Sequence, residues 1–362
     1  MHIHSVGIDL GKTPFHLVAL GDNGKVLLKK KFTQRQLIIF TANLQATLIG
    51  LEACSGAHFL GRALRGQGHD VKLIPAQFVK PFVKSNKNDF LDAEAIAEAV
   101  GRQNMRFVPI KTDDQLDLQA LHRVRDRLIT RRTSVINQLR AFLLERGLVF
   151  AKSPAKLRER MPEILENAEE DLTPRMRNLL ALLWSEWKDL EQQVVDLNHE
   201  VELIASSDAA CLRLRQIPGI GPLVATAIVA SIGNGAAFHK GREFAAWMGL
   251  VPKQYSTGGK AKLYGISKRG NRYLRKILIH GARAMVLRCK RDRVPMGAWM
   301  TALEARAPRN VLIVAAANKL ARNRMGGAVE WPGLSGISRA SCCVGKRNDQ
   351  HQVLPPTSAP DK

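Results

Sequence analysis

The pattern of apolar and polar positions predicts a mixed α/β fold at the start of the chain. Three short strands, joined by the turns "GKTP" and "GDNG", are predicted over residues 3–10, 15–20 and 25–32. Two further apolar runs, at 48–55 and 69–76, are separated by a helix-like segment long enough to connect parallel strands. Residues 89–100 are rich in Ala and Glu and predict a helix. The first hundred residues are therefore expected to form an α/β domain.

Two long helices are predicted next. Residues 112–147 begin with a capping box formed by Thr112 and Gln115 and continue as one basic helix up to Gly147. A second helix is predicted from about 174 to 205, and its apolar residues alternate in spacings of four and three, at Leu183, Trp187, Leu190, Val194, Leu197, Val201 and Ile204. This heptad spacing fits two helices packed within one chain and a coiled coil between chains equally well.

A glycine-containing turn follows the second long helix. The segment Ile217-Pro218-Gly219-Ile220-Gly221 precedes a small apolar helix, a pattern typical of a helix-hairpin-helix. Gly219 and Gly221 would let the backbone approach a phosphate, and the N–H groups at the start of the next helix would bind it. The alternative is a tight helical turn with no ligand.

Charge narrows the class of partner. The 362 residues carry a formal net charge of +23, and 45% of them are hydrophobic, so the chain is globular and strongly basic. Nucleic acid is the expected partner. A membrane is disfavoured because no apolar run reaches about 18 residues and the first ten residues lack a signal-peptide pattern, so we expect a cytoplasmic protein. The five cysteines suggest neither a disulfide framework nor a zinc site and are expected to be reduced.

One basic block stands out in the second half of the chain. Residues 253–276 include eight Lys or Arg residues and no acidic residue. A solvated surface normally mixes charges of both signs, so this block is expected to contact phosphates.

Four carboxylates are candidates for one site. Asp9 ends the first predicted strand, Glu52 lies inside the fourth, and Asp89 and Asp92 share one helix face. Taken singly, they allow an exposed turn or a kinase-like phosphate loop at Asp9, a salt bridge at Glu52, and a helix-dipole effect at the other two. Taken together, they predict a two-metal site of the kind that cuts phosphodiesters, on an RNase H-like sheet.

The order of the motifs resembles one family. The segments "GIDLGK", "LEACSGAHFLGRAL", "NKNDFLDAEAIAEAV", "LRQIPGIG", "GLVPKQYSTGGKAKLYGISKRGNRYLRKILIHGA" and "ANKLAR" look like the DEDD transposases of bacterial insertion sequences now known for bridge-RNA-guided recombination. The resemblance covers residues 3–322. It implies a RuvC-like, RNase H-fold catalytic domain over 1–110, a coiled-coil segment over 111–207 and a mostly α-helical transposase domain with the helix-hairpin-helix over 208–322.

The resemblance also implies the catalytic residues. The family's acidic tetrad falls on Asp9, Glu52, Asp89 and Asp92, with Mg²⁺ of the two-metal type as the cofactor. Its serine nucleophile lies in "PKQYSTGG", where we choose Ser256 because a primary hydroxyl is less crowded, and Thr257 stays open. The candidates for binding DNA phosphates beside it are Lys260, Lys268, Arg269, Asn271, Arg272 and Arg275.

The function expected from these features is strand cleavage and exchange at an insertion sequence. The expected partners are element and target DNA at the nucleoid, a guide RNA that binds the basic helix, and further copies of the chain in a dimer or tetramer. The rival functions are a Holliday-junction-type resolvase that uses water as its nucleophile, a phosphotransferase, and a repressor without catalysis. Residues 323–362 depart from the family pattern and are expected to be mostly disordered.

Overall fold

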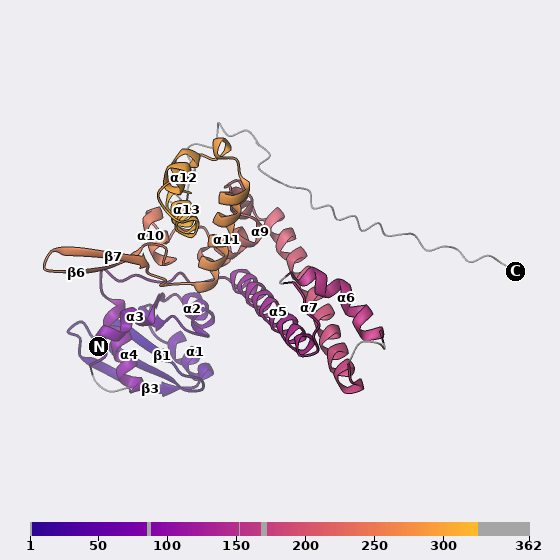
Figure 1. The fold of residues 1–362 in the computed structure, drawn as a ribbon. Helices are drawn as coiled ribbons and strands as arrows, with labels where there is room; N and C mark the ends of the chain where they lie inside the picture. The colour runs from indigo at the N-terminus through magenta and orange to yellow at the C-terminus, as the bar shows by residue number, and fades with distance from the viewer. Residues whose placement is uncertain (1, 85–87, 152, 168–171, 325–362) are drawn as a thin grey trace. The chain divides into compact units, whose positions relative to one another are not determined.

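The computed structural model describes residues 2–84, 88–151, 153–167 and 172–324 (Figure 1). The chain divides into two compact units, Met1–Ile204 with Thr226–Ala237, and Ala205–Ala225 with Phe238–Lys362. The expected disorder of 323–362 concerns residues that lie outside the described ranges, apart from the last two residues of the final helix, and stays a prediction.

The first unit opens with a five-stranded sheet in the order β3-β2-β1-β4-β5. Its strands are β1 (Ser5–Leu10), β2 (Phe15–Leu20), β3 (Val26–Phe32), β4 (Leu48–Glu52) and β5 (Asp70–Ile74). β1, β2 and β3 form an antiparallel meander, whereas β4 pairs in parallel with β1, and β5 in parallel with β4. All five strands were predicted from the sequence, and the mixed sheet agrees with the expected RNase H-like domain.

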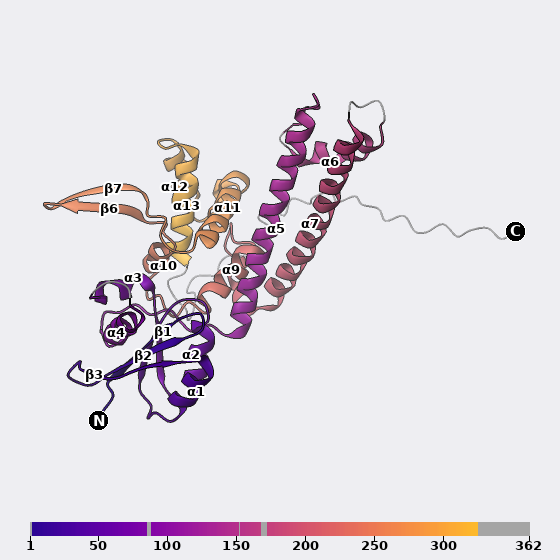
Figure 2. The same ribbon diagram turned by 90° about the horizontal axis from the view of Figure 1, so that it is seen from below.

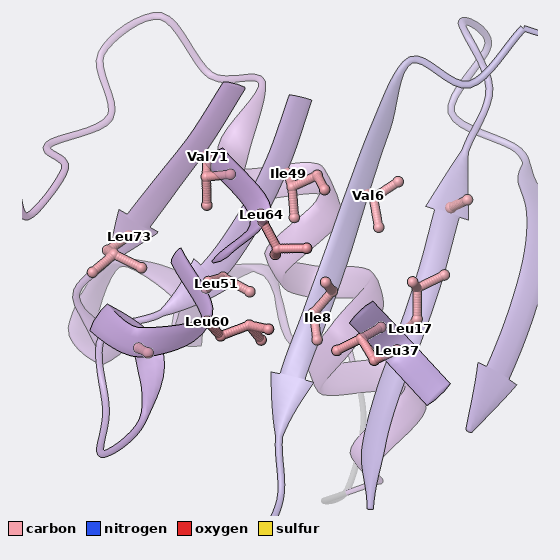
Figure 3. Packing of buried hydrophobic residues seen from close by; sticks show 12 residues of the cluster. Val6, Ile8, Leu17, Leu37, Ile49, Leu51, Leu60, Leu64, Val71 and Leu73 are labelled. Atoms are coloured by element: carbon pink, nitrogen blue, oxygen red, sulfur yellow. The ribbon is translucent and has the colours of Figure 1, made fainter. Parts of the chain in front are cut away.

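Helices cover both faces of this sheet. Helices α1 (Gln34–Ala42) and α2 (Ala57–Gly66) pack on one face, where Figure 3 shows their leucines against the strand residues. The members labelled there, all buried, are Val6, Ile8, Leu17, Leu37, Ile49, Leu51, Leu60, Leu64, Val71 and Leu73. Each such side chain contributes about 1.5–3 kcal/mol by leaving water. The other face is covered by α3 (Ala76–Val79), the short 3₁₀ helix η1 (Lys80–Phe82) and α4 (Asp89–Val100).

The long helices pack against each other within the chain. They are α5 (Asp113–Leu144), α6 (Pro154–Glu166) and α7 (Pro174–Ser207), and the capping box predicted at Thr112 is present at the start of α5. Both views show the three helices side by side (Figures 1 and 2). Trp187 and Leu190 of the predicted seam pack in one core with residues of α5 and α6. Intrachain packing therefore explains this part of the seam, and a coiled coil between chains stays a prediction.

Charged pairs join α5 to α7 beside that core. Arg131 Nε donates to Glu186 Oε1 at 2.7 Å, and Arg132 Nη1 donates to Glu191 Oε1 at 3.0 Å. Some of the basic side chains of α5 thus serve the fold of the first unit.

The second unit is mostly helical, as predicted. It contains α8 (Ala209–Arg215), the first residues of α9 (Pro222–Ile232), α10 (Gly241–Trp247), α11 (Arg272–Arg288), the 3₁₀ helix η2 (Arg291–Arg293), α12 (Gly297–Glu304) and α13 (Arg309–Arg324). Helix α13 packs against α10, α11 and α12. A feature that the sequence analysis did not anticipate is a two-stranded antiparallel hairpin, β6 (Pro252–Thr257) and β7 (Lys260–Ile266), which extends away from these helices in Figures 1 and 2.

Candidate active site and nucleic-acid interface

The alternation of side chains along the strands selects the residues that face α4. Val6 and Ile8 point into the core under α1 and α2, so Gly7 and Asp9 point to the opposite face. In β4, Ile49 and Leu51 point into the same core, which leaves Gly50 and Glu52 on the α4 face. Gly7 and Gly50 are paired in the parallel register, and the two carboxylates lie two residues beyond them, at the carboxyl ends of β1 and β4.

The two glycines let α4 lie directly on the strands. A Cβ at Gly7 would lie 2.0 Å from the carbonyl oxygen of Ala93, and one at Gly50 would lie 2.9 Å from Cβ of Val100. The hydroxyl of Ser5 donates to the carbonyl of Ala97 at 2.8 Å, so the helix runs antiparallel to β1. Its first turn therefore lies over the strand ends that carry the two carboxylates.

The first turn of α4 adds the other two carboxylates. Asn88 caps the helix by accepting a hydrogen bond from the backbone N–H of Phe90, and Asp89 and Asp92 follow in the first turn. The partial positive charge at a helix N-terminus favours acidic side chains there. Asp89 and Asp92 can therefore stabilise the start of α4 and also belong to a shared site.

Electrostatics show which carboxylates are close. Burial raises the pKa of Glu52 above its usual value, and the negative charges of Asp9 and Asp92 raise this pKa further. Asp9 and Asp92 therefore lie within electrostatic range of Glu52. Asp89 lies one turn earlier, where its carboxylate is 3.6 Å from the ring nitrogen Nδ1 of His16.

His16 is a residue of this site that the sequence analysis missed. It pairs directly with Asp9 across the β1–β2 ladder, its ring is buried, and its edge packs against Phe90 at a centroid distance of 4.7 Å. Its Nδ1 has no hydrogen-bond partner among the described residues. The sequence does hold a signal, because the four-residue turn 11–14 sets Leu10 opposite Phe15 and hence Asp9 opposite His16.

The donor set suits a hard divalent cation. Carboxylate oxygens are the ligands that Mg²⁺ prefers, and a bound cation would relieve the repulsion that raises the pKa of Glu52. Among the residues that the structure describes, no three His, Cys, Asp or Glu side chains are already arranged as a metal site. Side-chain rotations would have to complete it.

The predicted nucleophile lies on the β6–β7 hairpin. Ser256 and Thr257 are adjacent in β6 and both are exposed. Because neighbouring residues of a strand point to opposite faces, the two hydroxyls lie on opposite sides of the hairpin. Gln254 shares the face of Ser256, and its Nε2 donates to Ser256 Oγ at 2.7 Å. The sequence analysis did not single out this glutamine, because the strand was not predicted.

The candidate phosphate contacts divide into two groups. Five of them are exposed, namely Lys260, Lys268, Arg269, Asn271 and Arg272. Arg275 is buried, and both Asn271 and Arg275 have roles in the fold. Asn271 caps α11 by accepting from the backbone N–H of Leu274 at 3.1 Å.

Arg275 corrects a prediction. Its side chain is buried, and its Nη1 donates to the backbone carbonyls of Met248 at 3.0 Å and Arg269 at 2.7 Å. The loop that carries Lys268 and Arg269 is thereby fixed to the end of α10. The charge pattern led us to expect that Arg275 contacts a phosphate at the surface. Its buried guanidinium instead bridges two backbone carbonyls and holds this loop in place.

The glycine turn before α9 is present in the structure. Gly219 has a φ of 90°, which suits glycine, and a Cβ added there would lie 2.9 Å from the carbonyl oxygen of Gly281 in α11. Close packing of two backbones is therefore one reason for glycine at position 219. Gly221 has no heavy atom within 4 Å of an added Cβ. The phosphate-binding role of this turn and its assignment as a helix-hairpin-helix stay predictions.

Two remaining expectations concern thiols and membranes. The described cysteines, Cys54, Cys211 and Cys289, are all free. Within the described residues, no helix combines the length and the apolar character needed to cross a membrane.

Comparison with known proteins gives a consistent result. Residues 6–146 match the sequence-family model for DEDD transposases of the IS110 type. Residues 211–295 match the family model described as "Transposase IS116/IS110/IS902 family". The chain is 43% identical over 317 residues to the transposase for insertion sequence element IS1328 of Yersinia enterocolitica, covering 88% of this chain and 94% of that protein. It is 42% identical over 317 residues to the transposase for element IS1111A of Coxiella burnetii, covering 88% and 87%. It is 41% identical over 323 residues to a probable family 20 transposase of Pseudomonas aeruginosa, covering 89% and 96%.

Proposed function

This chain belongs to the IS110-type family of DEDD transposases, enzymes that cleave and transfer DNA strands, and we propose that it does so with an Mg²⁺-binding acidic tetrad and a serine nucleophile. The family is generally metal-dependent. The observation that carries the proposal is the close approach of α4 to β1 and β4, with Asp9 and Asp92 within electrostatic range of Glu52.

Asp9, Glu52, Asp89 and Asp92 would hold the metal. Bound there, Mg²⁺ would offset the negative charge that builds up on the phosphate during cleavage. The protein's part is to hold four carboxylates on two strand ends and one helix turn, so that their mutual positions follow from backbone packing.

Ser256 is the proposed nucleophile. In the cleavage step a bond forms between its Oγ and the phosphorus, one P–O ester bond of the DNA breaks, and the serine proton ends on the released sugar hydroxyl. A hydroxyl of the exchanged strand then reverses the step and frees the serine. The ester bond is conserved throughout, so the reaction needs no ATP.

Two local features support Ser256 over Thr257. The primary hydroxyl is less crowded at the phosphorus. In addition, Gln254 holds Ser256 Oγ by donating to one of its lone pairs, which leaves the hydroxyl proton free to depart. Among the described residues, no hydrogen bond holds the Thr257 hydroxyl in a comparable way.

The wider proposal includes the expected partners. Exposed Lys260, Lys268, Arg269 and Arg272 would contact DNA, with Gly219 and Gly221 as further phosphate contacts. A guide RNA would bind the basic helix α5 through its phosphates, and the active form would contain several copies of the chain. The resemblance and the charge of the helix support these points.

One experiment tests the chemistry. Labelled element-junction DNA, the RNA transcribed from the element's flank and Mg²⁺ are mixed with purified protein, and denaturant-resistant protein–DNA adducts are measured. Asp9→Asn and Ser256→Ala should abolish the adduct, whereas the isosteric Thr257→Val should retain it. Cutting by Ser256→Ala without an adduct would identify a resolvase that uses water. Loss of the adduct in Thr257→Val alone would make the threonine the nucleophile.

A further inference from the structure

The β6–β7 hairpin has no packing partner in the described part of the chain. Every residue of β6 is exposed, and in β7 only Ile266 is partly covered. A two-stranded hairpin with neither face packed is marginally stable in water. Something beyond the described residues is therefore expected to cover at least one of its faces when the protein works.

The register of the hairpin sorts its side chains into two faces of different chemistry. Gly258 and Gly259 form the turn, and both have positive φ, so Thr257 pairs with Lys260 and Tyr255 with Lys262. Tyr264 lies two residues beyond Lys262 and shares its face. We define this Lys–Tyr face by the residues Tyr255, Thr257, Lys260, Lys262 and Tyr264. The opposite face, here the serine face, has Gln254, Ser256, Ala261 and Leu263.

The chemistry of the Lys–Tyr face fits nucleic acid with unpaired bases. Its two ammonium groups attract phosphates, and no acidic residue from 253 to 276 competes with them. Tyr255 and Tyr264 are 64% and 55% exposed, so large parts of their rings are free for stacking. Bases inside a duplex already stack on their neighbours, whereas an unpaired base can stack on an exposed aromatic ring.

We propose that the Lys–Tyr face of the β6–β7 hairpin binds an unpaired DNA strand while Ser256, on the serine face, attacks a different strand. The proposal rests on the proposed function, because the position of the nucleophile on the same hairpin is what makes DNA the partner. Strand exchange requires locally unpaired DNA, and the hairpin would stand between the two separated strands. The strand that it binds is then not the strand that it cuts.

Binding without chemistry tests this proposal separately from the cleavage mechanism. Full-length protein is titrated, in EDTA, against a labelled DNA duplex with a short unpaired bubble and against the same duplex fully paired, and fluorescence anisotropy gives both dissociation constants. Wild type and Ser256→Ala should bind the bubble equally and more tightly than the paired duplex. This result does not depend on whether a covalent adduct ever forms.

The variants separate the two kinds of contact. Tyr255→Ala with Tyr264→Ala should weaken binding to the bubble by at least about 10-fold and leave the paired duplex unchanged. Lys260→Ala with Lys262→Ala should weaken binding to both DNAs and lower the slope of log affinity against log salt by about 2. Leu263→Ala is the matched control, because this equally exposed side chain is on the serine face.

Three results would overturn the proposal. The first is bubble binding by the tyrosine double variant that equals wild type. The second is a loss in Leu263→Ala as large as in the tyrosine variant. The third is tighter binding of an RNA bubble of the same sequence, which would assign the face to the guide instead of to DNA. Thermal melting of each variant checks that the fold is intact.

Discussion

Replacing Gly7 by alanine tests whether backbone packing positions the acidic site. The added Cβ would lie 2.0 Å from the carbonyl oxygen of Ala93 and 2.4 Å from the amide nitrogen of Ala97. Since protein Cβ atoms essentially never approach a heavy atom closer than 3.0 Å, α4 must move away by about 1 Å or more. Overpacking of this kind costs about 1–3 kcal/mol of unfolding free energy. Asp89 and Asp92 move with the helix.

Two measurements follow the consequences of that shift. For a unit of this size, the melting temperature should fall by about 3–10 °C. The affinity for Mn²⁺, titrated by electron paramagnetic resonance in place of Mg²⁺, should fall by about 10- to 100-fold, because carboxylates on a helix displaced by about 1 Å would reach a shared ion less well. Gly66→Ala is the control, since Gly66 ends α2 with open space around it and should change neither quantity adversely.

The reasoning would be refuted in either of two ways. If Gly7→Ala melts within about 1 °C of wild type, α4 does not lie directly on β1. If its melting temperature falls but its Mn²⁺ affinity does not, then metal binding does not depend on where α4 places Asp89 and Asp92.

Three further predictions concern titration and the neighbours of the site. Glu52 keeps its proton to higher pH in the folded chain than in the unfolded one, so its ionisation lowers the stability of the fold as pH rises past 4.5. Glu52→Gln should therefore raise the melting temperature at pH 7–8 in EDTA. The same variant should have no such effect below pH 4.5. Burial, with Arg125 as a smaller cause, lowers the pKa of His122 from 6.5 to about 4. The free energy of unfolding of wild type should therefore fall by up to about 3 kcal/mol as pH falls through this window. Urea unfolding of His122→Gln should show a smaller loss. His16 Nδ1 lies 3.6 Å from the Asp89 carboxylate, and we expect it to orient that carboxylate once a metal is bound. His16→Leu should then weaken Mn²⁺ binding by about 10-fold or more, whereas His16→Asn, which keeps a nitrogen near that position, should restore it. Equal affinities in the two variants would count against this role.

The sheet and α4 could be predicted because their patterns are local. Apolar residues alternate along β1 and run almost continuously through β2, and the Ala-rich run 89–100 coincides with α4 as observed. The acidic residues could be selected because a carboxylate at a buried strand end is costly without a partner. The role of Gly7 could not be inferred in this way, since it depends on a contact between segments more than eighty residues apart.

The hairpin and the role of Arg275 were missed for physical reasons. "PKQYST" and "KAKLYGI" have no buried face, so they lack the alternation of apolar and polar residues that marks a strand. Arg275 is one of eight basic residues in its block, and charge alone does not separate the one that turns inward to bridge two carbonyls. Its burial follows from the position of α11, which the sequence does not provide.

Because a two-glycine turn fixes the register of the hairpin, the number of residues in β6 determines which face carries Ser256. Because side chains alternate along a strand, insertion of a single residue between Gln254 and Ser256, with the Gln254–Leu263 pairing kept, would move the Ser256 hydroxyl to the opposite face of the hairpin. Such a change would leave composition, charge and overall fold almost untouched while turning the proposed nucleophile away from the DNA strand that it is proposed to attack. Length variation in this short stretch is therefore expected to inactivate the enzyme, even though the segment is exposed and looks as permissive as an ordinary surface loop.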